Sequence, residues 1–201
     1  MPLTFITKQG HAIASVFDDL AKLRIAVFRD FPYLYEGSEE YEKEYLKIYS
    51  KSERAFLFAV YDGEKMVGAT TCIPLSDETN EVQAAFKNAG SDIEKIFYFG
   101  ESILLTQYRG LGLGHRFFDE REKHAASFGT FKTTCFCSVE RINHPAQPAD
   151  YRSNDAFWIK RGYHKVPELT ATMEWPDIGE SDSTPKKMIF WTKELSDLLC
   201  L

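Results

Sequence analysis

Several classes of protein are excluded by what this sequence of 201 residues lacks. It has four cysteines, at 72, 135, 137 and 200, which are too few for a disulfide framework and lack the spacing of a metal site. No segment approaches the ~20 consecutive apolar residues that a membrane-spanning helix needs. Residues 1–8 contain neither the basic nor the apolar part of a secretion signal. We therefore expect a cytoplasmic protein that does not act in a membrane.

An excess of basic charge is also missing. The chain has 24 Lys and Arg residues against 30 Asp and Glu residues, a net charge of −6, which argues against binding to nucleic acid. Hydrophobic residues make up 44% of the chain, an ordinary share for a globular protein. No linker or internal repeat divides the chain, so we expect one domain over residues 1–201. The four cysteines are expected to be free, buried thiols, with Cys135 and Cys137 on one face of a strand.

Apolar periodicity predicts a chain that mixes helices and strands. Helical spacing covers residues 12–28 and should end near Phe31-Pro32, and a second helix should begin at Ser38. Two β-prone runs flank Asp62-Gly63, a strong signal for a hairpin. The remaining predicted elements are helices at 82–87, 112–127 and 153–161 and strands at 3–7, 55–61, 66–73, 96–105, 131–139, 170–175 and 187–193.

The glycine-rich segment between a predicted strand and a predicted helix is the most informative part of the sequence. Glycines at 110, 112 and 114 let backbone N–H groups approach an anion, and the N-terminus of the helix adds partial positive charge. The spacing does not match the dinucleotide fingerprint, and His115-Arg116 stands where a Walker loop needs Lys and Ser or Thr. The segment therefore favours a phosphate or pyrophosphate ligand of another kind over an empty turn.

Residues 107–112 match the pattern Q-x-x-G-x-G, which resembles the acyl-CoA pyrophosphate loop of the GNAT superfamily of N-acetyltransferases. The order of the predicted elements is similar to that family over nearly the whole chain. The resemblance implies an α/β (α+β) fold whose central mixed, mostly antiparallel sheet has about seven strands and is flanked by helices. Two central strands would splay apart to hold coenzyme A.

The resemblance also implies roles for particular residues, with acetyl-CoA as the acyl donor and no metal. The pantetheine arm would contact Ile103, Leu104, Leu105 and Thr106. Many members carry a tyrosine acid four residues before the glycine that closes the late helix, where this chain has Trp158; we expect Trp158 to wall the pantetheine channel. Tyr151 and Tyr163 are the nearest tyrosines, and neither is expected to serve as a dedicated acid. The residues implied for the pyrophosphate loop are Gln107, Arg109, Gly110, Leu111, Gly112, Leu113, Gly114 and His115.

Glu101 is the candidate catalytic base. Strand alternation places it on the face of Phe97, Phe99, Ile103 and Leu105, where burial would raise the pKa of its carboxyl toward neutrality. Its position also matches a glutamate that is common in the family. Two structural alternatives are an acid paired with a buried arginine and an acid turned outward at a bulge near Gly100.

Acidic and aromatic residues follow the first predicted helix, where the family builds its acceptor site. The glutamates at 36, 39, 40, 42 and 44 favour a solvated helix face over a wall that recognises cations. Aromatic side chains with polar tips suit a half-wet pocket, although core packing is the commoner use of such residues. The candidate acceptor-binding residues are Phe28, Phe31, Tyr33 and Tyr35.

These observations favour an N-acetyltransferase that moves an acetyl group from acetyl-CoA to a primary amine of a small molecule or peptide by direct attack. A catalytically degenerate acyl-CoA-binding regulatory module is the alternative, and a structural interaction domain with an empty loop is a third reading. The sequence leaves open the amine, the length of the acyl chain and the oligomeric state, a homodimer included.

Overall fold

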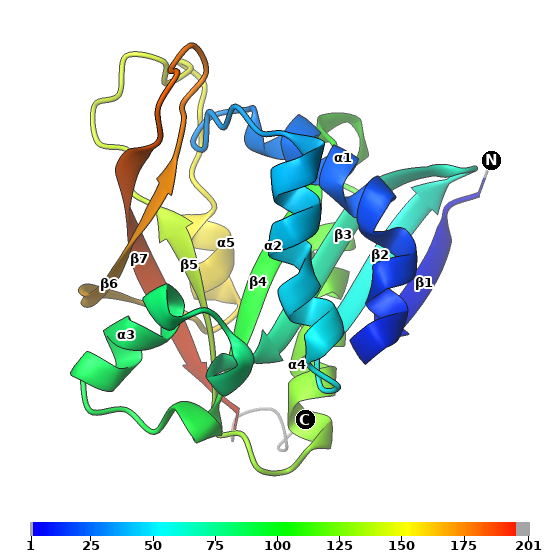
Figure 1. Cartoon of the computed structure of the whole chain (residues 1–201), viewed down its shortest axis with the longest axis vertical. Coiled ribbons are helices and arrows are strands. Elements are labelled where there is room, and N and C mark those ends of the chain that lie inside the picture. Colours follow the sequence, from blue (N-terminus) through cyan, green and yellow to red (C-terminus); the bar gives the residue numbers. More distant parts are fainter. Residues whose placement is uncertain (1, 196–201) are drawn as a thin grey trace.

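The computed structural model describes residues 2–195, whose strands form one seven-stranded sheet (Figure 1). The order in the sheet is β1-β2-β3-β4-β5-β7-β6, and only β4 and β5 pair in parallel. This is the mixed, mostly antiparallel sheet that the sequence predicts. The strands are β1 (Thr4–Gln9), β2 (Phe56–Asp62), β3 (Lys65–Pro74), β4 (Ile96–Leu104), β5 (Thr133–Val139), β6 (His164–Trp175) and β7 (Thr184–Glu194).

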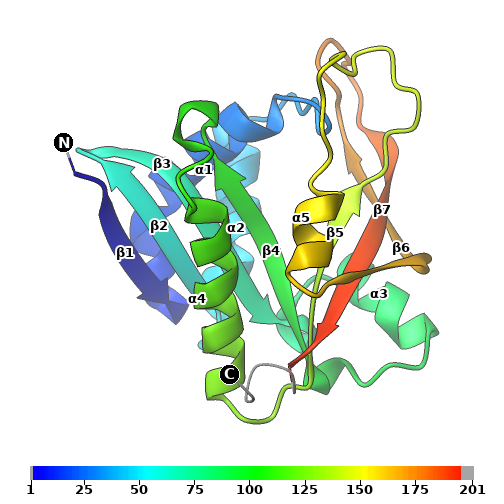
Figure 2. The same cartoon turned by 180° about the vertical axis from the view of Figure 1, so that it is seen from behind.

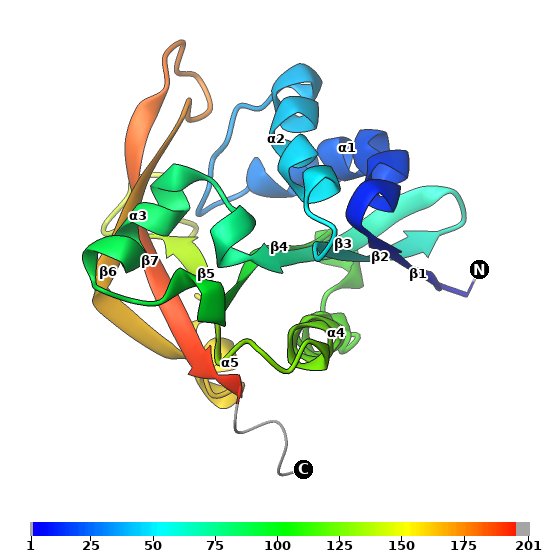
Figure 3. The same cartoon turned by 60° about the horizontal axis from the view of Figure 1, so that its bottom comes forward.

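Helices cover both faces of the sheet. Figures 1 and 3 show α1, α2 and α3 on one face, and Figure 2 shows α4 and α5 on the other. Within residues 2–195, no helix is both long and apolar enough to cross a membrane. The helices are α1 (Phe17–Phe28), α2 (Glu39–Lys51), α3 (Asn80–Asn88), α4 (Leu113–Ser127) and α5 (Asp155–Lys160), with 3-10 turns η1 (Gly10–Val16), η2 (Leu75–Asp77), η3 (Ile93–Lys95) and η4 (Thr106–Tyr108).

Each face of the sheet has its own apolar core, because the central strands β2 and β3 are buried on both sides. Leu20 of α1 and Leu46 of α2 belong to the core on one face, and Phe117 and Phe118 of α4 belong to the other. Cys135 and Cys137 of β5 both face the first core, as predicted; Cys135 is buried and Cys137 half-buried. Cys200 lies outside the described residues.

The predicted helix boundaries are largely confirmed. Ser38 is the N-cap of α2, and its Oγ accepts a hydrogen bond from the Tyr41 N–H at 3.3 Å. The prediction of one helix over 12–28 is wrong in its first part, where η1 precedes α1 as a 3-10 helix. The predicted end of the helix near Phe31-Pro32 also lies three residues beyond Phe28.

The boundaries of two predicted strands also need correction. The sixth strand begins at His164 rather than at 170, and its register against β7 shifts between Val166 and Thr170. The irregular stretch obscures the alternation on which the prediction depends. The fifth strand begins at Thr133 rather than at 131, since Phe131 instead packs its ring against Phe97 at 4.7 Å between centroids.

The two central parallel strands separate after a short contact. Pairing between β4 and β5 covers only Ile96 to Tyr98 opposite Thr133 to Cys135. Beyond Tyr98 the two strands diverge, as Figure 2 shows between α4 and α5. The backbone of β4 beyond Tyr98 therefore has no strand partner on its β5 side, which confirms the predicted splay.

A bulge in β4 overturns the predicted facing of Glu101. The register between β3 and β4 shifts between Thr70 and Cys72, opposite Gly100. Phe97 and Phe99 therefore face α4, whereas Ile103 belongs to the core beneath α1 and α2. Glu101 points to that second face, where it meets a guanidinium rather than an apolar surface. The expectation that Glu101 shares a face with Phe97 and Phe99 is wrong because alternation holds only in an unbroken strand.

Gly100 is needed at the bulge because Tyr49 of α2 lies directly over it. A Cβ at Gly100 would lie 1.8 Å from Tyr49 Oη and 2.8 Å from Thr71 Oγ1. We predict that Gly100→Ala destabilises the fold by about 1–3 kcal/mol through overpacking and lowers Tm by ~2–4 °C for each kcal/mol. Tyr49→Phe in the same chain should recover part of the loss because it removes the clashing hydroxyl.

Gly114→Ala is the matched control for the thermal-unfolding comparison. A Cβ there would meet only Phe157, at 3.6 Å, and alanine is a better helix former than glycine. An unchanged Tm in Gly100→Ala, or an equal fall in Gly114→Ala, would contradict the packing argument.

Candidate active site

The glycine loop has the backbone of an anion cradle. Gly110 and Gly112 have left-handed φ angles of +80° and +78°, and a Cβ at either would meet nothing within 4 Å. Internal packing therefore leaves this space free for an approaching ligand. Gly112 is the N-cap of α4 and supplies no side-chain cap, so the N–H groups of the first turn remain available to an anion.

The diverging strands and α5 continue this cradle into the sheet. The unpaired edge of β4 leads through the short turn η4 into the loop, and Ser102 on that strand is exposed. On the other side, Trp158 of α5 packs against Phe136 of β5, with 5.0 Å between ring centroids. Phe157 lies 4.9 Å from the ring of His115 in the first turn of α4. The fold thus brings the predicted loop, the predicted strand and Trp158 to one opening in the sheet.

The features of this opening fit a nucleotide thioester such as acyl-CoA. Its diphosphate matches the free N–H groups and the open space at Gly110 and Gly112. The amides of a pantetheine arm match the unpaired backbone of β4. The loop side chains Gln107, Arg109, Leu111 and His115 are all exposed, whereas Ile103 and Leu113 are buried and would contribute through their backbone.

The two tyrosines nearest the late helix both contact other side chains of the protein. Tyr163 is fully buried, and its hydroxyl lies 3.0 Å from Thr134 Oγ1 and donates to Glu122 Oε1 at 3.1 Å. Tyr151 is half-buried and packs edge-on against Phe31, with 4.6 Å between centroids. Tyr163 thus fills a packing position, and Tyr151 belongs to the face of α1 and α2.

Glu101 lies in a buried ion-pair network, as in the alternative of an acid paired with a buried arginine. Arg24 of α1 donates to both Glu101 Oε2 and Glu42 Oε2, and its guanidinium lies between the rings of Phe28 and Tyr45. Burial raises the pKa of the Glu101 carboxyl above its ordinary value, although Arg24 opposes the shift. Burial alone would lower the pKa of Arg24, but the two carboxylates hold it well above its usual range.

The backbone of Glu101 is anchored from both faces of the sheet. Its carbonyl accepts hydrogen bonds from Thr70 Oγ1 at 2.7 Å and from Arg121 Nη1 of α4 at 3.4 Å. Its N–H donates to Thr71 Oγ1 at 3.3 Å. These hydrogen bonds hold the backbone of the bulge in place, so the Glu101 side chain keeps its orientation toward Arg24.

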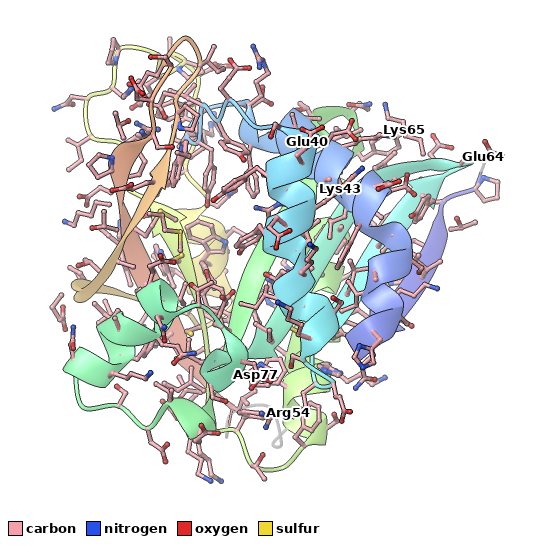
Figure 4. The ribbon with its side chains drawn as sticks, viewed as in Figure 1. Glu40, Lys43, Arg54, Glu64, Lys65 and Asp77 are labelled. Carbon is pink, nitrogen blue, oxygen red and sulfur yellow. The ribbon has the colours of Figure 1, made fainter. Side chains whose placement is uncertain are left out.

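Most of the acidic stretch forms a solvated face, as the sequence favours. Glu36 pairs with Arg29, Glu44 pairs with Lys47, and each pair lies at the surface. Figure 4 shows Glu40 and Lys43 projecting from α2, where Lys43 also pairs with Asp18 of α1. Glu42 is the exception, because it is fully buried beside Arg24.

The candidate aromatic residues have different surroundings. Phe28 and Tyr33 pack together at 4.6 Å between centroids, next to Arg24, and Phe31 packs against Tyr151. These three are half-buried at the face of α1 and α2, where an acceptor could reach them. Tyr35 is instead buried in the core, and its backbone bridges to Asp177.

The segment that carries Phe31 and Tyr33 is fixed by Arg141, which follows β5, and by Trp175 at the end of β6. Arg141 donates to the Pro32 carbonyl and to the Tyr33 carbonyl, each at 3.0 Å, and Trp175 Nε1 donates to the latter at 3.1 Å. Arg141 also pairs with Asp177 at 2.6 Å. Segments far apart in the sequence thus close the top of this face.

Sequence reasoning missed two residues of this face, Arg24 and Glu78. Arg24 had a signal, since it is a lone charge within the apolar run from Leu23 to Phe28. Glu78 had none, because residues 76–80 are polar and typical of an exposed turn. Glu78 is nevertheless only 5% exposed, and burial raises its pKa to about 7.

Diverging parallel strands, a glycine loop that begins a helix and flanking helices on both faces are the arrangement of an acyl-CoA-dependent acetyltransferase fold. The chain matches the model of the acetyltransferase (GNAT) family over residues 20–149 and belongs to that family. It is therefore an acyltransferase. None of the curated protein sequences with which the chain was compared matches it significantly.

Solved structures with low sequence identity share this fold along nearly their whole length. An N-acetyltransferase from Staphylococcus aureus Mu50 has a TM-score of 0.59 at 9% identity and covers 96% of this chain and 99% of its own. A ribosomal-protein-alanine N-acetyltransferase from Brucella melitensis has a TM-score of 0.58 at 11% identity, covering 94% and 99%. An aminoglycoside 6′-N-acetyltransferase complexed with coenzyme A has a TM-score of 0.55 at 17% identity, covering 94% and 97%.

The burial of Glu78 predicts a pH-dependent stability. Its pKa is about 7 in the folded chain against 4.5 for a free glutamate, so the stability that its proton confers is complete below about pH 4.5 and is lost as the pH rises through 7. Gln mimics the protonated carboxyl. Glu78→Gln should therefore stabilise the fold at pH 8, by up to about 3 kcal/mol, and have little effect at low pH.

Thermal or urea unfolding at about pH 5 and pH 8 measures this difference. Glu81→Gln, three residues along on the exposed face of α3, is the control and should behave as wild type at both values. A Glu78→Gln effect that is the same at both pH values would show that the carboxyl is not buried as described.

Proposed function

We propose that the protein is an N-acetyltransferase that moves an acetyl group from acetyl-CoA to a primary amine of a small molecule or peptide by direct attack. The observation that carries the proposal is the opening where the unpaired edge of β4 meets the glycine loop. The proposal takes residues 1–201 as one catalytic domain that acts in the cytoplasm. Membership of the GNAT family and the coenzyme A complex of the aminoglycoside acetyltransferase support it.

The donor would be held mainly by backbone groups. The N–H groups at Gly110 to Gly114 would bind the diphosphate, with Gln107, Arg109 and His115 beside it. The backbone of Ile103 to Thr106 would pair with the pantetheine amides, and Trp158 would line the β5 side. Bound in this way, acetyl-CoA supplies an acyl group on a thioester that an amine can attack.

Glu101 would take the proton that the attacking amine must lose. The C–N bond forms as the C–S bond breaks, the electron pair of that bond leaves on sulfur, and the proton of the amine passes to the carboxylate. The raised pKa of Glu101 suits this role near neutral pH. A thiol of pKa ~8.5 leaves without a dedicated acid, consistent with the engagement of Tyr163 by Thr134 and Glu122.

A regulatory module that binds acyl-CoA without transfer is the second candidate. The ion pair between Arg24 and Glu101 favours it, because a carboxylate held by a guanidinium must give up that contact to bind a proton. Transfer of a labelled acetyl group to a panel of amines distinguishes the two functions, whereas binding of coenzyme A does not.

The glycine loop can be tested with a matched pair of variants. Gly112→Asp places a negative side chain where the diphosphate would approach, so we predict that coenzyme A affinity falls at least about tenfold, through charge repulsion and loss of the cradle. Gly129→Asp is the control, since Gly129 also has a left-handed φ of +67° and open space around its Cβ. It lies beyond the opposite end of α4.

Calorimetric titration with coenzyme A measures the effect, and the Tm of both variants reports any shared backbone strain. If Gly112→Asp bound coenzyme A as tightly as Gly129→Asp does, the loop would not be the phosphate site.

Glu101 can be tested through the pH dependence of kcat/KM. Glu101→Gln keeps the shape and removes the basic group, and we predict a loss of roughly 10²–10⁴-fold in kcat. In wild type, kcat/KM should rise with pH as the carboxyl ionises, over a range above that of an ordinary glutamate because burial raises its pKa. That rise should vanish in Glu101→Gln.

The exposed Glu36→Gln serves as the control, with unchanged kcat and pH profile expected. A Glu101→Gln enzyme with the wild-type profile would remove Glu101 from proton transfer and leave its pairing with Arg24 as a structural role.

A further inference from the structure

Three carboxylates from separate elements are buried on the face of α1, α2 and α3. Glu42, Glu78 and Glu101 are at most 5% exposed, and each has an Oε1 atom that is buried without a hydrogen-bond partner among the described residues. Arg24 is the one cation within residues 2–195 that pairs with any of them, and it pairs only with Glu42 and Glu101. This face therefore buries more negative than positive charge.

The turn that carries Glu78 is held in a fixed position. Asp77 accepts hydrogen bonds from Ser52 at 2.5 Å and Arg54 at 3.3 Å, and Figure 4 shows Asp77 and Arg54 together below α2. Gln83 closes the turn by donating to the Glu78 carbonyl at 2.5 Å. The Thr79 N–H donates to Glu78 Oε2 at 2.5 Å, which leaves only Oε1 without a partner.

Titratable groups from several elements lie near enough to Glu78 for charges to act between them. Burial raises the pKa of Tyr45 and Tyr49 on α2, and the carboxylates of both Glu78 and Glu101 raise it further. Glu78 and Glu101 therefore act on the same pair of tyrosines, and we call these four residues the carboxylate–tyrosine cluster. Charges also act between Glu78 and several other groups. These are Arg24 of α1, Glu81 of α3, Tyr98 of β4, and Cys135 and Cys137 of β5.

We propose that Glu78 binds a second ammonium group of the acceptor, so that the preferred substrate is a diamine or longer polyamine whose reacting nitrogen lies at Glu101. This inference rests on the proposed function. It places the cation-binding carboxylate on the turn before α3, because Glu36, which precedes α2, and Glu39 and Glu44 of α2 already have lysine or arginine partners.

The chemistry of this cluster suits an alkylammonium group. The Glu78 Oε1 atom offers a buried acceptor, and a charge-assisted N–H···O bond is about twice as strong as a neutral one. The faces of tyrosine rings attract cations and tolerate the methylene groups between two nitrogens. Tyr45, which belongs to the cluster, is half-buried and therefore reaches the surface.

The experiment compares α,ω-diaminoalkanes with n-alkylamines of the same length as acceptors. In wild type, KM should be lower for the diamine. Glu78→Gln should raise KM for the diamine about 10- to 100-fold, the loss expected for a hydrogen bond to a charged group, and leave KM for the alkylamine unchanged. Glu81→Gln is the matched control and should keep the wild-type ratio.

A second measurement uses wild type alone and does not depend on how a variant folds. Since burial raises the pKa of Glu78 to about 7, its charge increases between about pH 6 and pH 8 while both amines stay protonated. The preference for the diamine should grow over that interval. It should not grow in Glu78→Gln.

Two outcomes would overturn the inference: equal KM values for the two kinds of amine in wild type, or an equal effect of Glu78→Gln on both. Calorimetric titration of the diamine into the protein with coenzyme A separates this inference from the proposed function. Diamine binding that depends on Glu78 without acetyl transfer would support the site and reject the transferase. Equal transfer to alkylamines and diamines would support the transferase and reject the diamine site.

Discussion

The pairing of Arg24 with Glu42 and Glu101 is the interaction on which the rest of this face depends. It joins α1 and α2 to β4, which is distant from both helices in sequence, at one largely buried guanidinium. A buried ion pair contributes little net stability, but loss of one partner is costly because the other charge is left in a medium of low dielectric. Without Arg24, two carboxylates would face each other out of water. The packing of α1 and α2 on the sheet is therefore tied to the same group that sets the charge of Glu101.

Residue 101 connects the two faces of the sheet. Its side chain meets Arg24 on one face, while its carbonyl accepts a hydrogen bond from Arg121 of α4 on the other. One bulge therefore fixes the positions of both the glycine loop at the start of α4 and the half-buried aromatic residues of the α1 face. An enzyme whose acetyl donor and amine acceptor bind on opposite sides of a sheet needs such a fixed point. Bond formation requires the two substrates to meet at close contact distance.

Sequence patterns predicted the parts of this protein that depend on local chemistry. The glycine loop, the hairpin at Asp62-Gly63 and the cap at Ser38 follow from backbone requirements that a few neighbouring residues express. The bulge at Gly100 could not be predicted in the same way, because it arises from the register between two strands and reverses the face of Glu101. Glu78 was out of reach for a related reason: its turn is held in place through the neighbouring Asp77 by Ser52 and Arg54, which are distant in sequence.

Because β4 and β5 pair only from Ile96 to Tyr98, the sheet consists of two halves that are joined at a short junction. A ligand whose amides pair with the free edge of β4 would lengthen this junction and add its own hydrogen bonds to those of the sheet. Folding and donor binding would then be linked equilibria: above the dissociation constant, each tenfold rise in ligand adds about 1.4 kcal/mol to the free energy of unfolding. The stability of such a chain follows the supply of its own substrate.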